Sequence, residues 1–160
     1  MRLIDATLAL AGALSLACGH SAVAADLGQP AGCLVAGDSI AVDVGRCAPQ
    51  CATDARIGIG SAAIVARVRP ARLVVISAGS NDPDNPRLRD NLERMRVRAG
   101  AARVVWIVPI DARAAAAVRA VARKRGDDLV TFVPARDCVH PRCPRCVARQ
   151  IFPAAPALVP

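Results

Sequence analysis

The chain has 160 residues, of which 54% are hydrophobic, 2% aromatic and 21% charged, and its formal net charge is +8 at pH 7. This length fits one domain with a single core, and the large apolar share excludes an intrinsically disordered chain. The basic residues are almost all arginines scattered along helical stretches, which is typical of a solvated surface and indicates no specific nucleic-acid partner, although such a surface can attract anionic polymers or lipids.

The first 25 residues have the layout of a secretory signal peptide. An apolar run covers residues 6–17, and small residues end in Ala24 and Ala25, after either of which we expect cleavage. A buried N-terminal helix is the alternative, and a lipid-modified Cys18 is a minor one. The apolar run is too short to span a bilayer, so we expect no transmembrane anchor after removal of the leader. The sequence therefore predicts a periplasmic or secreted protein with one domain over residues 26–160.

Six of the seven cysteines remain after removal of the leader. An even number of cysteines in an exported chain indicates disulfide bonds, whose pairing cannot be deduced from the sequence. The candidates are Cys33, Cys47, Cys51, Cys138, Cys143 and Cys146.

Short apolar runs alternate with helical, Ala-rich stretches along the rest of the chain. The runs are apolar on both faces, as in buried parallel strands. We predict strands over 33–37, 72–78, 103–108 and 128–133, a weaker strand over 53–57, and helices over 61–68, 85–99 and 111–125. This alternation predicts an α/β fold, a doubly wound parallel sheet of about five strands with right-handed crossovers.

Helix boundaries are predicted at two places. Asp111 is a good N-cap and Gly126 a good stop for the helix over 111–125. Near the end of the chain Pro144 interrupts the helical pattern, so only 147–152 is predicted helical, and residues 143–160 can form an irregular tail.

Residues able to perform acyl-transfer chemistry follow three of the predicted strands. Ser39 follows the first strand, Asn81 follows the strand over 72–78, and Asp137 and His140 follow the last strand. Each segment alone is typical of a capped turn or a surface ion pair. In a parallel sheet, however, all these strand ends lie on one edge, where a nucleophile, an amide donor and an acid-base pair can meet.

Three sequence blocks resemble those of the SGNH hydrolases, also called the GDSL esterase and lipase family. Gly37-Asp38-Ser39-Ile40 is similar to the nucleophile block, with Ile in place of the usual Leu. Gly79-Ser80-Asn81-Asp82 is similar to the GxND block, and Asp137-Cys138-Val139-His140-Pro141 is similar to the DxxH block. The resemblance covers residues 33–141 and implies a flavodoxin-like three-layer sandwich.

The resemblance also implies a mechanism. Ser39 would be the nucleophile, His140 its base, and Asp137 the carboxylate that orients His140. The oxyanion would be bound by the backbone N–H groups of Ser39 and Gly60 and by the side chain of Asn81. No metal and no organic cofactor is implied.

The glycine block, Arg56-Ile57-Gly58-Ile59-Gly60-Ser61-Ala62, can be aligned with the family pattern in more than one register. We favour Gly60 as the backbone donor to the oxyanion, with Ser61 and Gly58 as alternatives. A backbone donor needs no particular side chain.

The spacing of Cys143 and Cys146 is found in disulfide-bonded loops, zinc knuckles and redox dithiols. We favour a disulfide, then zinc, then a redox motif, because an exported compartment oxidises thiols. Cys138 lies inside the expected catalytic loop, and its pairing with Cys143, Cys146 or a cysteine near the serine would restrain Asp137 and His140.

The sequence thus predicts an exported serine hydrolase, of the carboxylesterase, acetylesterase, thioesterase or lysophospholipase class. Its substrate would be a small-molecule or envelope-polymer acyl ester. The competing interpretations are a noncatalytic SGNH-like envelope or binding protein and, third, a zinc-stabilised interaction domain. Neither the acyl group nor the oligomeric state can be deduced from the sequence.

Overall fold

The structure is a computed structural model that describes residues 32–100, 103–136 and 140–153. The predicted leader, residues 1–25, lies outside the described residues. The strands are β1 (Cys33–Gly37), β2 (Ala52–Ala55), β3 (Leu73–Ser77), β4 (Arg103–Ile107) and β5 (Asp128–Val130). The helices are α1 (Ser39–Arg46), α2 (Ser61–Val65), α3 (Leu88–Arg98), α4 (Ala112–Arg125) and α5 (Pro144–Ile151).

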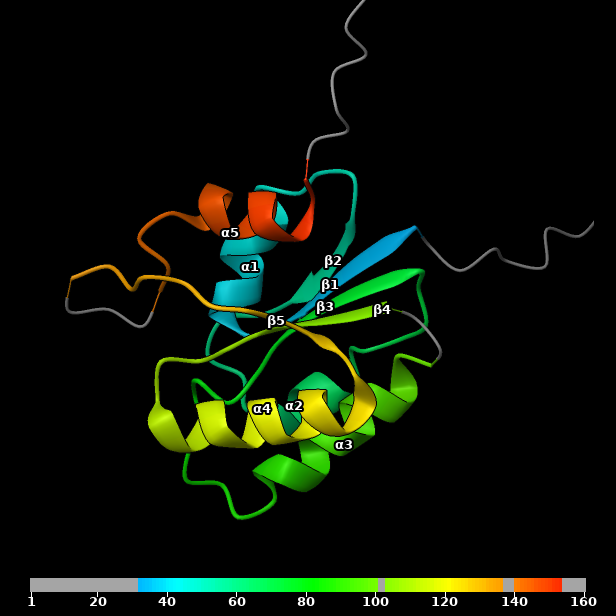
Figure 1. The fold of residues 1–160 in the computed structure, drawn as a ribbon, viewed down its shortest axis with the longest axis vertical. Coiled ribbons are helices and arrows are strands. Elements are labelled where there is room, and N and C mark those ends of the chain that lie inside the picture. Colours follow the sequence, from blue (N-terminus) through cyan, green and yellow to red (C-terminus); the bar gives the residue numbers. More distant parts are fainter. Residues whose placement is uncertain (1–31, 101–102, 137–139, 154–160) are drawn as a thin grey trace, which may run out of the picture.

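The sheet has five strands in the order β2-β1-β3-β4-β5, and all neighbouring strands are parallel. Helices α1 and α5 cover one face, and α2, α3 and α4 cover the other (Figure 1). This is the flavodoxin-like strand order. The predicted fold, a doubly wound α/β sandwich with three layers, is confirmed.

Each face of the sheet has its own apolar core because successive strand residues point to opposite faces. Val35, Val75 and Val105 pack toward α1 and α5. Their neighbours in the same strands pack toward α2, α3 and α4, and the largest of them is the fully buried Trp106. Burial on both faces explains why the strand sequences are apolar throughout rather than alternating.

The single tryptophan is fixed by a polar contact at the edge of the core. Trp106 Nε1 donates to Asp127 Oδ2 at 3.0 Å, and the Nε of Arg96 donates to the same carboxylate at 2.7 Å. The buried indole N–H thereby has the partner that it requires.

Several predicted boundaries differ from the structure. The caps of α4 are as predicted, with Asp111 accepting from two backbone N–H groups and Gly126 in the left-handed conformation. Strand β5 ends at Val130 because the chain then leaves the sheet and forms a hairpin with Pro141. The prediction that Pro144 interrupts the last helix is wrong, since Pro144 is the first residue of α5. At this position the helix makes no hydrogen bond with the backbone N–H, so proline, which has none, is accepted.

Within the described residues there are two disulfide bonds, Cys33–Cys51 and Cys143–Cys146, and Cys47 is a free thiol. Cys138 lies outside the described residues. The hypothesis that it pairs with Cys143 or Cys146 is wrong, because those two cysteines are bound to each other. No helix in the described parts of the chain is long and apolar enough to cross a membrane.

Candidate functional site

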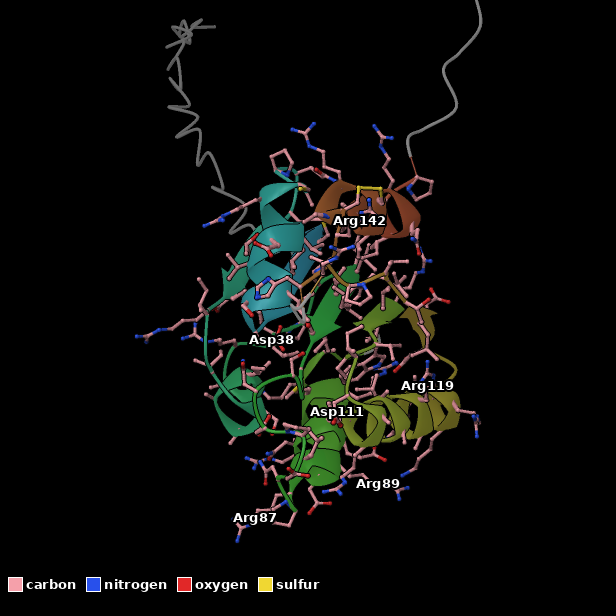
Figure 2. The ribbon with its side chains drawn as sticks, turned by 90° about the vertical axis from the view of Figure 1, so that its left-hand side faces the viewer. Asp38, Arg87, Arg89, Asp111, Arg119 and Arg142 are labelled. Carbon is pink, nitrogen blue, oxygen red and sulfur yellow. A yellow bond between two sulfur atoms is a disulfide. The ribbon has the colours of Figure 1, made fainter. Side chains whose placement is uncertain are left out.

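Ser39 is the first residue of α1 and directly follows the turn at the carboxyl end of β1. The preceding residue, Asp38, is fully buried and caps the helix, because its Oδ1 accepts the N–H of Ile40 at 3.1 Å. The Ser77 hydroxyl donates to the same oxygen at 2.8 Å, and the Asp38 N–H donates to the Ser77 carbonyl at 3.2 Å. These bonds fix the start of α1 to the end of β3, and Asp38 is labelled in Figure 2.

The start of α1 offers unpaired donors for an anion. The Ser39 side chain makes no hydrogen bond with a described residue, and its backbone N–H is one of the first-turn groups that a helix leaves without an internal partner. The residue is only 6% exposed. Negative charge that develops near the Ser39 N–H is favoured by the partial positive charge of the helix N-terminus.

His140 lies on a segment that pairs with the chain shortly after β5. Pro134 and Pro141 form an antiparallel bridge, and the Ala135 N–H donates to the His140 carbonyl at 2.8 Å. The Arg142 N–H donates to the Val133 carbonyl at 2.9 Å and closes the hairpin. The backbone around His140 is therefore fixed by hydrogen bonds to the segment that follows β5.

The His140 ring contacts α1, the helix that Ser39 begins. Its Nδ1 lies 2.6 Å from Oδ2 of Asp43, a residue 97 positions earlier in the chain. Asp43 follows Ser39 by four residues, so the two side chains lie on the same helix face, about one turn apart. In the neutral tautomer that donates its Nδ1 proton to this carboxylate, Nε2 carries the lone pair that can accept a proton.

No hydrogen bond joins Ser39 to His140 within the described residues. Such contacts are often long in the absence of substrate and tighten when it binds. The Asp43 contact nevertheless places His140 beside the serine helix.

Asp43 is a candidate site residue that the sequence did not point to. The expected carboxylate, Asp137, lies outside the described residues. The available signal was the spacing of four residues from Ser39, which places both side chains on one face once this segment is known to be helical. The short helix gave too weak a periodic pattern to reveal this.

Asn81 and Gly60 lie on neighbouring loops at the carboxyl ends of β3 and β2. The Asn81 side-chain amide donates to the carbonyl of Ile59 at 2.9 Å, which fixes the orientation of the peptide unit that carries the Gly60 N–H. A second amide hydrogen of Asn81 is left for a ligand. The Gly60 N–H itself donates to no described residue.

A polar cluster lies beneath these loops and occupies one of the alternative donors. Asp82 Oδ2 accepts the Ser61 N–H at 2.9 Å, the Ser61 hydroxyl at 2.6 Å and the Asn85 amide at 2.8 Å. The Asn91 amide donates to the Ser61 hydroxyl at 2.9 Å. Because the Ser61 N–H is already bound, Gly60 is the better candidate of the two as an oxyanion donor.

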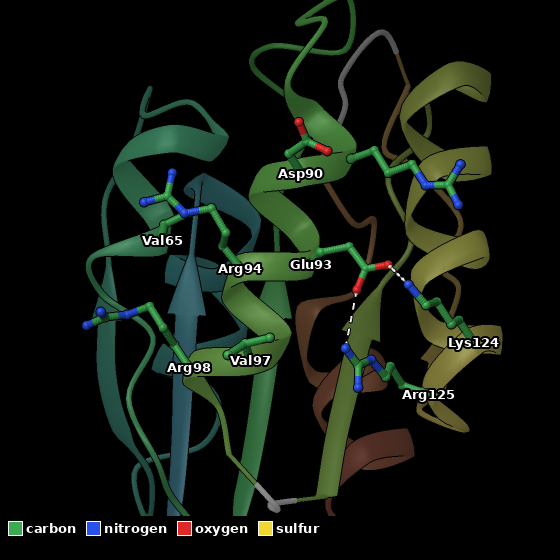
Figure 3. Close-up of a pocket in the computed structure, with 9 residues that line it drawn as sticks. Val65, Asp90, Glu93, Arg94, Val97, Arg98, Lys124 and Arg125 are labelled. Carbon is green, nitrogen blue, oxygen red and sulfur yellow. Dashed lines mark hydrogen bonds and ion pairs between the residues drawn. The ribbon is translucent and has the colours of Figure 1, made fainter.

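A cavity of about 660 Å³ lies away from these residues, in the layer formed by α2, α3 and α4 (Figure 3). Its lining is rich in basic side chains, among them Arg89, Arg94 and Lys124. The Lys124 ammonium donates to Glu93 at 2.9 Å and lowers the pKa of that carboxyl, with smaller contributions from neighbouring arginines. None of the predicted site residues lines this cavity.

No group of three or more His, Cys, Asp or Glu side chains in the described parts of the chain is arranged to hold a metal ion. Cys143 and Cys146, the residues considered for zinc, form a disulfide instead.

No protein-family model and no curated protein matches the chain. Among solved structures, the chain is similar to the C-terminal catalytic domain of peptidoglycan O-acetyltransferase A from Streptococcus pneumoniae, in a structure with a methylsulfonyl adduct. The identity is 17% and the TM-score 0.43, over 61% of this chain and 62% of that chain, so the chain spans less than two thirds of that structure. At these values the likeness does not extend to activity or to individual residues.

Proposed function

We propose that the protein is an exported serine hydrolase that cleaves an ester, thioester or O-acyl group. The contact between His140 Nδ1 and Asp43 Oδ2 carries this proposal, because it brings the histidine to the helix that begins at Ser39. The three sequence blocks that resemble the SGNH hydrolases support the same assignment.

In the first half-reaction, Ser39 Oγ attacks the acyl carbonyl carbon while His140 Nε2 takes the hydroxyl proton. The Asp43 carboxylate holds the Nδ1 proton and stabilises the charged ring; Asp137 remains a second candidate for this role. The tetrahedral intermediate collapses as the leaving alcohol or thiol takes the proton from His140. An acyl group then remains on Ser39.

In the second half-reaction, His140 Nε2 deprotonates a water molecule, which attacks the acyl carbonyl. The carboxylic acid leaves, and the proton returns from His140 to Ser39 Oγ. In both steps the oxyanion is stabilised by the N–H groups of Ser39 and Gly60 and by the Asn81 amide. No step requires a metal or an organic cofactor.

Export is supported by a disulfide as well as by the leader-like N-terminus. Cys33–Cys51, in which Cys51 is buried, is the kind of bond that persists in an oxidising compartment. The acyl ester can belong to a small molecule or to an envelope polymer, since both present the same carbonyl group to Ser39.

Covalent labelling tests the proposal directly. A fluorophosphonate probe is expected to label the mature protein on Ser39, because a serine that a neighbouring base has activated displaces the fluoride and becomes phosphonylated. Labelling and hydrolysis of a short p-nitrophenyl ester should both disappear in Ser39→Ala. The matched control is Ser80→Ala, a serine in the Asn81 loop, which should keep both. A folded wild-type protein that neither labels nor hydrolyses the ester would instead indicate a noncatalytic binding protein.

Asn81→Ala is expected to lower kcat for the same ester by about 10²- to 10³-fold, the usual cost of removing one oxyanion donor. The KM should change little, since the donor acts mainly on the charge that develops in the transition state. Asn85→Ala is the comparison, because Asn85 binds Asp82 and Ser61 below the loop and has no proposed contact with substrate. Equal losses of kcat in both variants would show that Asn81 does not act as an oxyanion donor.

A further inference from the structure

The Cys143–Cys146 disulfide lies at the N-terminus of α5, where it is open to solvent. Cys143 is the N-cap residue and is half-buried, whereas Cys146 is exposed. Both line a cavity of about 370 Å³, together with Phe132 and the exposed Val133. Figure 2 shows this disulfide as the yellow bond on α5. A thiol-bearing molecule can therefore reach the Cys146 sulfur from the cavity.

The other disulfide has a different setting. Cys33–Cys51 joins β1 to the start of β2 and closes a loop of 18 positions. Cys51 is only 8% exposed and belongs to the core between the sheet and α1. Its reduction would free the start of β2, the edge strand, and would require a reductant to reach a buried sulfur. This bond is therefore expected to resist reduction more than Cys143–Cys146 does.

The surroundings of Cys143 stabilise a thiolate. The Cys146 N–H donates to Cys143 Sγ at 3.2 Å, and the helix N-terminus places partial positive charge on the same sulfur. Arg142 lines the same cavity, and no acidic residue is among the lining residues. If the disulfide is opened, Cys143 is therefore the better leaving group of the pair.

We propose that Cys143–Cys146 is a thiol–disulfide exchange site that accepts two electrons from a dithiol, either a small molecule or a polypeptide with two cysteines. A thiolate of the dithiol attacks the exposed Cys146 Sγ. The S–S bond breaks, and its electron pair goes to Cys143 Sγ, which leaves as the thiolate. The second thiol of the dithiol, after losing its proton, attacks the mixed disulfide and releases Cys146. Both cysteines end reduced, and the dithiol ends as a disulfide.

The mature protein tests this with its second disulfide as an internal control. It would be equilibrated in buffers of increasing ratio of reduced to oxidised dithiothreitol, quenched with acid, alkylated after denaturation, and mapped by peptide mass. Cys143 and Cys146 are expected to be half reduced at a ratio about 100-fold lower than Cys33 and Cys51. Cys47, which is a free thiol among the described residues, should be alkylated in every buffer. Reduction of both disulfides at the same ratio, or of Cys33–Cys51 first, would overturn the proposal.

A variant tests the leaving group separately. In Cys146→Ser the backbone N–H of residue 146 is retained, so the Cys143 thiol should react with iodoacetamide at pH 7 at least tenfold faster than Cys47 in the same molecule. Adding Arg142→Gln should slow the Cys143 reaction and leave that of Cys47 unchanged, because Arg142 lines the cavity of Cys143 and Cys146. Equal rates at Cys143 and Cys47 would contradict the thiolate assignment, and mapping of an intact Cys33–Cys51 bond checks that the variant is folded.

Discussion

Asp43→Asn is expected to lower kcat for a short acyl ester by about 10⁴-fold while the protein stays folded. An Asn side chain keeps the shape of Asp43, but its amide can donate to His140 Nδ1. It then holds the ring in the tautomer with the proton on Nε2, where it cannot accept a proton from Ser39. Steady-state kinetics would show the loss in kcat with little change in KM, and fluorophosphonate labelling of Ser39 would slow in parallel.

Two variants show whether Asp43 acts through His140 or only through local charge. Arg46 lies 3.9 Å from the other Asp43 oxygen in an exposed pair, so Arg46→Ala should change kcat by less than about threefold. Asp137→Asn tests the carboxylate that the family resemblance implies. A large loss in Asp137→Asn, with near-normal kcat in Asp43→Asn, would show that the assignment of Asp43 as the orienting residue is wrong.

Gly37→Ala is expected to destabilise the protein by about 3 kcal/mol or more and to lower its Tm by about 10 °C or more. Gly37 has a φ of 147°, and a Cβ there would lie 2.1 Å from the Ser77 carbonyl oxygen. That oxygen also accepts the Asp38 N–H, so any shift that relieves the overlap moves the residue that caps the serine helix. The decrease in Tm is measured by thermal unfolding monitored by circular dichroism.

Gly126→Ala is the matched control for backbone strain without crowding. Gly126 also has a positive φ, 69°, but a Cβ at this position would meet nothing within 4 Å. Its replacement should cost only the left-handed strain of about 1 kcal/mol. Similar Tm losses in the two variants would show that contact with Ser77 is not what requires glycine at position 37.

The sequence predicted the layer architecture well because burial on both faces of a parallel sheet leaves a strong local pattern. The apolar runs that became β1, β3 and β4 needed no knowledge of their neighbours, and Asp111 and Gly126 mark the ends of α4 by cap chemistry alone. The start of α5 was missed because proline breaks a helix in its interior but is accepted in the first turn. Sequence pattern alone did not show which case applied to Pro144.

Disulfide pairing is a second feature that the sequence pattern alone did not predict. Six candidate cysteines were identified, but their pairing depends on distances between segments. Cys33 meets Cys51 because β1 and β2 are neighbours in the sheet, with Leu34 paired to Ala52. Cys47, closer to Cys33 in sequence, lies at the end of α1 and remains free among the described residues.

The sequence by itself determined the fold class and proposed Ser39, Asn81 and His140 as site residues, because strand ends and short motifs are local features. Only the tertiary structure showed that His140 contacts Asp43, since that contact joins residues 97 positions apart and depends on the hairpin after β5 meeting α1. It also showed that the Ser61 N–H donates to Asp82, which favours Gly60 over Ser61 as the proposed oxyanion donor. Local patterns specify which groups are available, whereas their partners are decided by how distant segments pack.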